Sequence, residues 1–258
     1  MTNELRQILE VHNVGKVFGG LRALDAVNLQ VRRGDCFGII GANGAGKTTL
    51  LNVITGYLPP TTGTVTFDGT EVTGKTPYQL AKSGMGRTFQ ITQPFAEMTV
   101  LENVMTGALF SANGRKRSIA EARAFCEEPL RLVGLADQAD VMAGSLTLGA
   151  KKKLELARVL ATEPKLMLPD EVMGGLTRSE VEEISEVLER IRDSGTTTIV
   201  MVEHLVHVIT RLCDHVFVLN FGRELFQGRA DDVVEHPEVI QAYLGKPQTA
   251  GEQASGTE

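Results

Sequence analysis

The sequence predicts an α/β fold in which a largely parallel, helix-covered sheet carries an inserted helical region. Between residues 36 and 219, short apolar segments alternate with segments of helical periodicity, which is the pattern of a parallel sheet with crossover helices. From about residue 99 to residue 140 the strands stop, and Leu101, Val104 and Ala108 repeat at helical spacing. The 258 residues suffice for one large domain, or for one core with a small subdomain.

Composition and charge narrow the class of protein. The net charge is −6, so the basic face of a general nucleic-acid-binding protein is not expected. Cys36, Cys126 and Cys213 are far apart and form no CxxC pair, so we expect neither a disulfide framework nor a zinc site, and a reducing compartment is favoured. The first residues do not resemble a signal peptide, and no apolar run approaches the ~20 residues that span a bilayer. A membrane role would therefore come through a partner.

The first part of the chain contains strand-like segments around a glycine-rich turn. Apolar alternation predicts two strands near the N-terminus, and an Asp-Gly turn ends a third, short strand. An apolar run precedes the glycine-rich turn, and a further strand edge comes later. In chain order the segments are 8–14, 24–31, 36–40, 63–69 and 85–90.

After the helical region, helices and strands alternate again. Periodicity predicts helices at 120–134, 148–161 and 178–193, and β-branched or apolar runs predict strands at 165–168, 197–202 and 216–219. The polar break at 111–118 contains three basic residues, 115–117, which we expect to be a solvated loop, with anionic lipid headgroups as an alternative partner. Residues 245–258 have almost no apolar side chains, which predicts a disordered tail.

The segment 41–49 has the composition of a phosphate-binding loop. It follows the apolar run 36–40 and leads into a helical segment at 48–56. Glycines let backbone N–H groups approach phosphate oxygens, and a helix N-terminus favours negative charge. At this spacing Lys47 can reach the β- and γ-phosphates, and the Thr48 hydroxyl can ligate Mg²⁺. We therefore expect the chain to bind a nucleoside triphosphate. The candidate binding residues are Gly41, Ala42, Asn43, Gly44, Ala45, Gly46, Lys47, Thr48 and Thr49.

Two carboxylates follow a second apolar run. Residues 166–168 lead through Pro169 to Asp170 and Glu171. In this position Asp170 is suited to hold Mg²⁺ through water, and Glu171 to polarise an attacking water. Because proline cannot donate to a sheet ladder, Pro169 is expected at the last position of its strand.

Gln90 and His204 are weaker candidates, and each follows a predicted strand. The Gln90 amide can contact Mg²⁺ or the attacking water, and His204 can donate a hydrogen bond to the γ-phosphate. Taken singly, a loop glutamine and a lone histidine are more often structural residues. That structural interpretation is kept for the other histidines, which are His12, His207, His215 and His236.

Taken in order, these motifs resemble those of the ATP-binding subunit of an ABC transporter, over residues 6–245. The resemblance adds an aromatic that stacks on adenine and a signature motif before the helix at 148–161. Phe18 matches the aromatic, residues 41–49 match Walker A, and Gln90 matches the Q-loop. Thr147 and Gly149 match the signature, Asp170 and Glu171 match Walker B and its catalytic base, and His204 matches the switch histidine.

This resemblance implies a P-loop NTPase of the ABC type. Its expected parts are a RecA-like core, an antiparallel β edge, a helical subdomain at about 92–162 and a disordered tail at 246–258. It implies ATP as the nucleotide, and Mg²⁺ held by Thr48, Gln90 and Asp170. It also implies that Glu171, His204 and Gln90 act in catalysis.

Within the family, the sequence is most similar to the branched-chain amino acid type of importer. The similarity lies in residues 86–91 around Gln90, in 202–204, and in the ending 238–245. It implies a subunit that hydrolyses ATP to energise uptake of branched-chain amino acids or a related amide- or urea-like solute. Two alternatives stay open, namely the ATPase of a lipopolysaccharide or lipid exporter, and a regulatory nucleotide-binding subunit with weak hydrolysis.

The resemblance also implies partners and a location. Two cassettes, identical or paralogous, pair head to tail, with each ATP between Walker A of one and the signature of the other. Transmembrane permease subunits receive the motion, and a periplasmic or extracellular solute-binding protein delivers the solute. The expected location is peripheral, on the cytoplasmic face of a prokaryotic cell membrane, and no nucleic-acid partner is expected.

Four residues depart from the family's usual pattern. In the signature, Leu148 replaces a glycine and Ala150 replaces a glutamine. Thr177 stands where aspartate is common, and Pro169 replaces an aliphatic residue. These departures bear on the expected rate of ATP hydrolysis more than on the fold.

Overall fold

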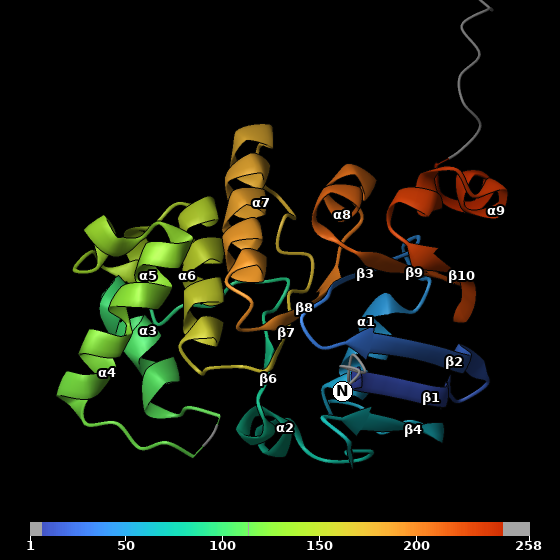
Figure 1. Ribbon diagram of the computed structural model, residues 1–258, viewed down its shortest axis with the longest axis horizontal. Coiled ribbons are helices and arrows are strands. Elements are labelled where there is room, and N and C mark those ends of the chain that lie inside the picture. Colours follow the sequence, from blue (N-terminus) through green and yellow to red (C-terminus); the bar gives the residue numbers. More distant parts are fainter. Residues whose placement is uncertain (1–6, 113, 245–258) are drawn as a thin grey trace, which may run out of the picture.

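Two β-sheets with a group of helices beside them make up this computed structural model, which describes residues 7–112 and 114–244 (Figure 1). The strands are β1 (Gln7–Phe18), β2 (Leu21–Arg32), β3 (Cys36–Ile40), β4 (Thr62–Phe67), β5 (Thr70–Glu71), β6 (Met85–Arg87), β7 (Leu166–Leu168), β8 (Thr198–Val202), β9 (His215–Asn220) and β10 (Arg223–Arg229). The helices are α1 (Lys47–Ile54), α2 (Pro77–Ser83), α3 (Val100–Leu109), α4 (Ile119–Phe125), α5 (Glu127–Val133), α6 (Leu148–Leu160), α7 (Arg178–Asp193), α8 (Val206–Leu212) and α9 (Pro237–Val239). The tail predicted at 246–258 lies outside the described residues.

The larger sheet has six strands in the order β10-β9-β3-β8-β7-β6. Pairing is parallel from β9 through to β6, and only β10 runs antiparallel to its neighbour. Every residue of β3, β7 and β8 is buried, which explains why these strands read as continuous apolar runs rather than as alternating ones. The prediction of a largely parallel sheet is confirmed.

The smaller sheet has four strands in the order β2-β1-β4-β5, and all its pairs are antiparallel. From Val27 to Arg32, strand β2 alternates between buried and exposed residues, as expected where one face is packed and the other meets water. Strand β1, which pairs with a neighbour on each side, does not keep a regular alternation and has register shifts. The antiparallel edge expected from the resemblance is therefore present, and Figure 1 shows it beside helix α1.

Successive side chains of the larger sheet belong to two separate hydrophobic cores, because adjacent residues of a strand point to opposite faces. Phe37 and Ile39 of β3 pack into the core that contains helix α1 and the antiparallel sheet. Cys36 and Ile40 of the same strand pack into the core that contains α6, α7 and α8. Helix α1 is thus fixed between the two sheets, with its N-terminus at the carboxyl end of β3.

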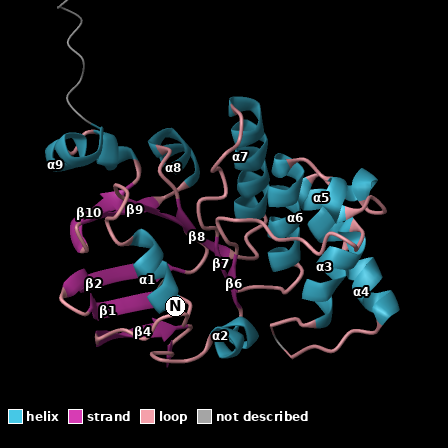
Figure 2. Ribbon diagram, turned by 180° about the vertical axis from the view of Figure 1, so that it is seen from behind, coloured by secondary structure: helices cyan, strands magenta, loops and turns pink. Residues whose placement is uncertain are grey.

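Helices α3 to α6 lie together at one side of the larger sheet (Figure 2). Their shared core contains Leu101, Val104 and Ala108 of α3, as the helical spacing predicted. Thr99 and Ser118 begin α3 and α4 with complete capping boxes, in which the N-cap and N3 side chains each accept from the other residue's backbone N–H. These caps define where each helix starts.

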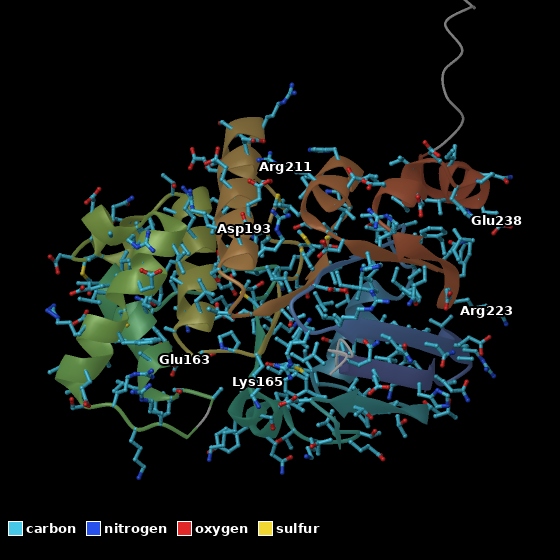
Figure 3. All side chains as sticks on the ribbon, in the orientation of Figure 1. Glu163, Lys165, Asp193, Arg211, Arg223 and Glu238 are labelled. Carbon is cyan, nitrogen blue, oxygen red and sulfur yellow. The ribbon has the colours of Figure 1, made fainter. Side chains whose placement is uncertain are left out.

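The expectation of a solvated basic loop at 115–117 is wrong for one of its residues. The side chain of Arg117 is only 5% exposed and forms an ion pair with Glu163 at 2.5 Å. It also donates to the carbonyl of Ala108 at 3.1 Å and lies 3.9 Å from the ring centroid of Phe125. Partners on α3, on α4 and beyond the end of α6, where Figure 3 labels Glu163, hold this arginine inside, and a single-sequence pattern does not reveal them. Arg115 and Lys116 are exposed, as expected.

All three cysteines are buried and free. The Sγ atoms of Cys36 and Cys213 are 3.7 Å apart beside the larger sheet, whereas Cys126 lies where α4 meets α5. Over the ranges 7–112 and 114–244, none of the helices is long and apolar enough to cross a membrane.

Candidate nucleotide-binding site

The glycine-rich turn joins the carboxyl end of β3 to the start of α1, where the sequence predicted it. Gly46 is the N-cap of α1 and has φ 108°. A Cβ atom at Gly46 would lie 2.8 Å from the carbonyl oxygen of Ala23, and one at Gly41 would collide with the carbonyl of Leu219. Both positions therefore require glycine, because the backbone of neighbouring strands passes directly over the turn.

Lys47 is buried at the base of this turn, with 5% of its surface exposed. Its Nζ donates to the carbonyl oxygen of Gly41 at 2.7 Å and to that of Ala42 at 3.2 Å. Burial lowers the pKa of the ammonium, and the carboxylates of Glu171 and Asp170 oppose that shift. The two carbonyl oxygens thus fix the position of the Lys47 ammonium at the base of the turn.

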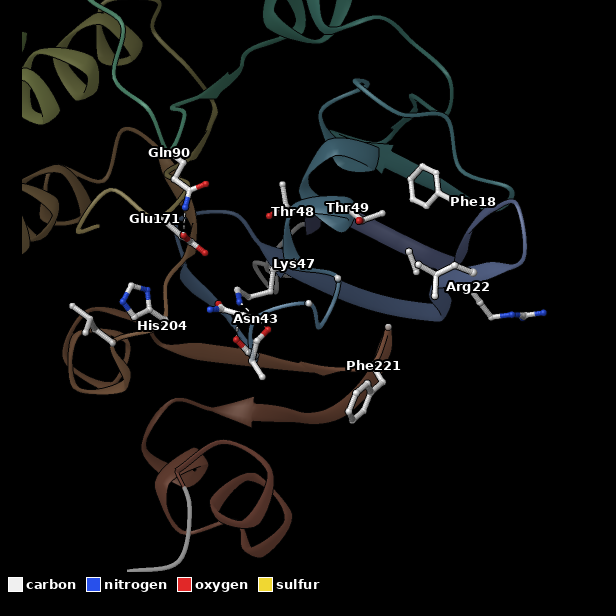
Figure 4. Close-up of a pocket in the computed structure, with 18 of the residues that line it drawn as sticks. Phe18, Arg22, Asn43, Lys47, Thr48, Thr49, Gln90, Glu171, His204 and Phe221 are labelled. Atoms are coloured by element: carbon white, nitrogen blue, oxygen red, sulfur yellow. Dashed lines mark hydrogen bonds between the residues drawn. The ribbon is translucent and has the colours of Figure 1, made fainter. Parts of the chain in front are cut away.

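A cavity of about 1210 Å³ opens over the turn (Figure 4). It brings together residues from the antiparallel sheet, the phosphate-binding turn, the end of β6 and the carboxyl ends of β7 and β8. The predicted residues that line it are Phe18, Gly41, Ala42, Asn43, Gly44, Gly46, Lys47, Thr48, Thr49, Gln90, Glu171 and His204.

Several lining residues were not predicted. Leu21, Arg22 and Ala23 come from the start of β2, and Leu205, Val206, His207, Phe221 and Gly222 complete the wall. His207, for which a structural role is expected, is one of these wall residues. The turn at Phe221 reaches the cavity because the N–H of Gly222 donates to the carbonyl of Ala45 at 2.8 Å. No local pattern marks this contact, since 177 positions separate the two residues. Ala45, a predicted binding residue, is buried beneath the cavity.

Asp170 lies below the cavity and does not line it. Its side chain is 7% exposed and accepts from Nη2 of Arg87 at 2.8 Å. Its backbone N–H donates to Oγ1 of Thr88 at 3.1 Å. Strand β7 ends at Leu168, as in the predicted range 165–168, so Pro169 follows the strand and does not occupy its last position. Pro169 uses only its carbonyl, which accepts from the N–H of Val202 at 2.9 Å.

Glu171 lines the cavity from the carboxyl end of β7. Its Oε2 accepts from Nε2 of Gln90 at 2.7 Å, a contact drawn in Figure 4. The backbone of Glu171 has φ 46°, a conformation that is unusual for a residue with a side chain and is often found at functional sites. Its N–H donates to the carbonyl of Val202 at 2.9 Å, which holds this backbone against β8.

His204 lies on the loop after β8, where its side chain is 49% exposed and lines the cavity. The preceding residue, Glu203, is fully buried, and its Oε1 accepts from the N–H of Met173 at 3.0 Å. The Oε2 of Glu203 lies 4.0 Å from Nδ1 of His204. Burial raises the pKa of the Glu203 carboxyl to about 7.

The two signature residues do not reach this cavity. Thr147 is the N-cap of α6, and its Oγ1 accepts from the N–H of Ala150 at 3.3 Å. Gly149 lies in the first turn of the same helix, where a Cβ atom would lie 2.9 Å from Oε1 of Glu180. Thr177 begins α7 with a complete capping box to Glu180. A threonine at that position thus has a helix-capping role that aspartate would also fill.

Comparison with known proteins assigns the family. The family model described as "ABC transporter" matches residues 24–174, which is more than half of the chain. The chain belongs to the ABC transporter family. As an ABC cassette, it is an ATP-hydrolysing protein with the fold of the P-loop NTPases.

Proteins of similar sequence align with nearly the whole of this ABC cassette. A high-affinity branched-chain amino acid transport ATP-binding protein, BraF of Pseudomonas aeruginosa, is 35% identical over 93% of this chain and 99% of its own. The protein LivG of Escherichia coli, which has the same description, is 34% identical over 93% of this chain and 98% of its own.

Solved ABC cassettes share the fold. The ADP conformation of the cassette MJ1267 has a TM-score of 0.83 and 34% identity, over 93% of this chain and 100% of that chain. A dimeric, post-hydrolysis cassette, MJ0796, bound to ADP and Pi, has a TM-score of 0.76 and 26% identity, over 86% of this chain and 98% of that one.

Proposed function

We propose that this ABC cassette energises the import of branched-chain amino acids or a related amide- or urea-like solute. The observation that carries its role as an ATPase is the cavity that joins the phosphate-binding turn to Gln90, Glu171 and His204. The solute class is supported by the descriptions of BraF and LivG, which are similar over 93% of the chain.

In this proposal ATP binds with its phosphates on the turn at 41–49. The N–H groups of that turn and the Lys47 ammonium compensate the phosphate charge. Phe18, 44% exposed at the edge of the cavity, stacks on the base. Thr147 and Gly149 would contact the γ-phosphate of ATP bound to a second copy. Because the Thr147 hydroxyl accepts from Ala150, its own proton is available to a phosphate oxygen.

The donor set near the γ-phosphate fits Mg²⁺. Thr48 and Asp170 offer hydroxyl and carboxylate oxygens, and Gln90 donates through its nitrogen to Glu171, so its amide oxygen is available to a metal. Mg²⁺ prefers such oxygens and needs only one or two protein ligands beside the phosphates. When bound, the ion would neutralise charge that develops on the phosphoryl oxygens.

The protein residues then carry the proton chemistry. Glu171 would hold the attacking water and accept its proton, and the Gln90 amide would keep the Glu171 carboxylate oriented. His204, exposed to the same cavity, would donate a hydrogen bond to the γ-phosphate as charge develops there.

We further propose the assembly in which this chemistry is used. Two cassettes pair head to tail. The dimeric structure of the cassette MJ0796 supports pairing of cassettes. The helices at about 92–162 follow Gln90 and pass its movement to transmembrane permease subunits. A solute-binding protein acts on the other side of the membrane. The unit at 6–245 would act from the cytoplasmic face of the membrane.

Two variants test the proposed roles in the purified chain. Glu171→Gln keeps the shape of the side chain but cannot accept a proton, so ATP turnover should fall ~10²–10⁴-fold while ATP binding survives. Lys47→Ala removes the cation of the turn, so binding itself should be lost. Calorimetry with ATP and a phosphate-release assay separate the two. Wild-type turnover in Glu171→Gln would contradict the role of Glu171, and normal ATP affinity in Lys47→Ala would contradict the phosphate site.

A further inference from the structure

We propose that Arg87 is a positioning residue that holds the Asp170 carboxylate in the orientation required to bind Mg²⁺ with ATP. This inference rests on the proposed metal role of Asp170. Arg87 is the last residue of β6, and its register partner in β7 is Leu168, two residues before Asp170. Its side chain is 8% exposed, and it does not line the nucleotide cavity.

The guanidinium of Arg87 connects the segment after β7 to the end of helix α1. Nη2 donates to Oδ2 of Asp170 at 2.8 Å. Nη1 donates to Oδ1 of Asn52 at 2.7 Å and to Oγ1 of Thr55 at 2.9 Å, at the end of helix α1. Helix α1 begins at the phosphate-binding turn, so Arg87 fixes Asp170 relative to the helix that carries Lys47 and Thr48.

Two aromatic rings flank the guanidinium. Its Cζ lies 5.5 Å from the ring centroid of Tyr57 and 5.2 Å from that of Phe89, and these rings contact each other edge to face at 5.8 Å. They keep water from the ion pair, which strengthens it. Phe89 also precedes Gln90, so the same cluster supports two of the proposed metal ligands.

The geometry makes Arg87 a fixed anchor rather than a mobile counterion. Its hydrogen bonds to Asn52 and Thr55 engage neutral acceptors that do not depend on the nucleotide. Because Oδ2 of Asp170 accepts from Arg87, the carboxylate cannot rotate freely, and its other oxygen keeps one orientation. Loss of a side chain that hydrogen-bonds to a metal-ligating carboxylate typically lowers the metal affinity about 10–100-fold. ATP without metal would be held by the turn at 41–49 and would not depend on Arg87.

The test compares three variants. Arg87→Met keeps the length of the side chain and removes all three hydrogen bonds. Arg87→Lys keeps the charge but has a single nitrogen, which cannot reach both helix α1 and Asp170 in a fork. Arg117→Met is the matched control, because Arg117 is another buried, ion-paired arginine beside an aromatic ring. It lies in the helical group, which is the part of the chain that contains α3 to α6.

The measurement is the affinity for a non-hydrolysable ATP analogue by calorimetry, first in EDTA and then over a series of Mg²⁺ concentrations. In EDTA, all variants should match the wild type within about twofold. The Mg²⁺ concentration that gives half of the affinity gain should rise about tenfold in Arg87→Met and in Arg87→Lys. In Arg117→Met it should not change. If Arg87→Met does not fold, Arg87→Lys gives the same test.

Each contrary result has one meaning. If Mg²⁺ does not raise the affinity of the wild type, the proposed metal site is wrong, and the role of Arg87 falls with it. If the wild type responds to Mg²⁺ and both Arg87 variants respond equally, the proposed metal site stands and the positioning role is wrong. If Arg117→Met loses the response as the Arg87 variants do, the effect reflects a general loss of stability, and the positioning role is again overturned.

Discussion

Glu203 is fully buried next to the switch-loop position His204, and it retains an ionisable carboxyl there. Burial raises its pKa from the ordinary 4.5 to about 7, and the nearby Glu171 acts in the same direction, whereas the N–H of Met173 opposes the shift. An acid whose pKa rises on folding binds its proton more tightly in the folded state. The free energy of unfolding therefore falls as the pH rises from 4.5 to about 7, and then levels off.

Replacement of Glu203 by glutamine should remove this fall in the free energy of unfolding at higher pH. Glutamine can accept from Met173 through its amide oxygen and stays neutral at every pH. We expect Glu203→Gln to exceed the wild type in free energy of unfolding at pH 8.5 by about 1–3 kcal/mol, with a much smaller difference at pH 5.5. Urea unfolding at the two pH values measures it, and Glu224→Gln, at an exposed site on β10, is the control. Equal differences at both pH values would contradict a pKa near 7.

Single residues differ in how far their roles follow from sequence. Lys47 and Thr48 are predictable because one short segment contains the whole phosphate-binding turn. Arg87 is not, because its partner Asp170 is 83 positions away and only the parallel pairing of β6 with β7 brings them together. Phe221 reaches the nucleotide cavity in the same way, through a turn between β9 and β10.

At the scale of elements, helix caps explain two positions in the family's motifs. Thr147 caps α6 and Thr177 caps α7. Both helices thus begin at a hydroxyl that accepts from a backbone N–H, so the cap defines the end of the motif loop. The four departures from the usual pattern, Leu148, Ala150, Thr177 and Pro169, leave these helix starts and the end of β7 intact.

Removal of the α7 cap should destabilise the chain measurably. Thr177→Ala leaves the N–H of Glu180 without its hydroxyl acceptor and disrupts the capping box. We expect the melting temperature in scanning calorimetry to fall by about 2–4 °C. Thr177→Asp keeps an acceptor at the cap and should melt close to the wild type. A Thr177→Ala variant with an unchanged melting temperature would show that the cap contributes nothing in this context.

Elements with strong local signals were predicted well. The helix predicted at 178–193 is α7, and its sequence combines an N-cap, an amphipathic pattern and a following Ser-Gly. Helix α8 was missed because it is only seven residues long and Leu205 caps it without a side-chain hydrogen bond. Helix α2 was missed although Thr76, Pro77 and Gln79 form a readable capping box.

At the scale of the whole molecule, one copy contains only part of the proposed catalytic site. The cavity contains the turn at 41–49 with Glu171 and His204, whereas Thr147 and Gly149 are absent from its wall. The alternation of strands and helices predicted the sheet, but it could not predict this separation, because the distance between the two motifs depends on how the helical group packs.

Mixing two inactive variants tests the shared site. Thr147→Asp keeps a good N-cap and directs a carboxylate at the partner's γ-phosphate, so it should bind ATP but lose turnover. Lys47→Ala should also be inactive. In a head-to-tail pair of one copy of each, one site combines an intact turn with an intact signature. Phosphate release should therefore reappear on mixing. A mixture that stays as inactive as its components would contradict the head-to-tail arrangement.

The burial of every cysteine has a practical consequence for measuring motion in this protein. A thiol reagent can alkylate a buried sulfur only while the surrounding structure is open, and burial raises the pKa of the Cys126 thiol to about 11, so its reactive thiolate is scarce. Cys126 lies among helices α4 and α5, and Cys36 and Cys213 lie beside the larger sheet. Labelling rates at the two places therefore report separately on opening of the helical group and of the β3–α8 region, in the unmodified chain.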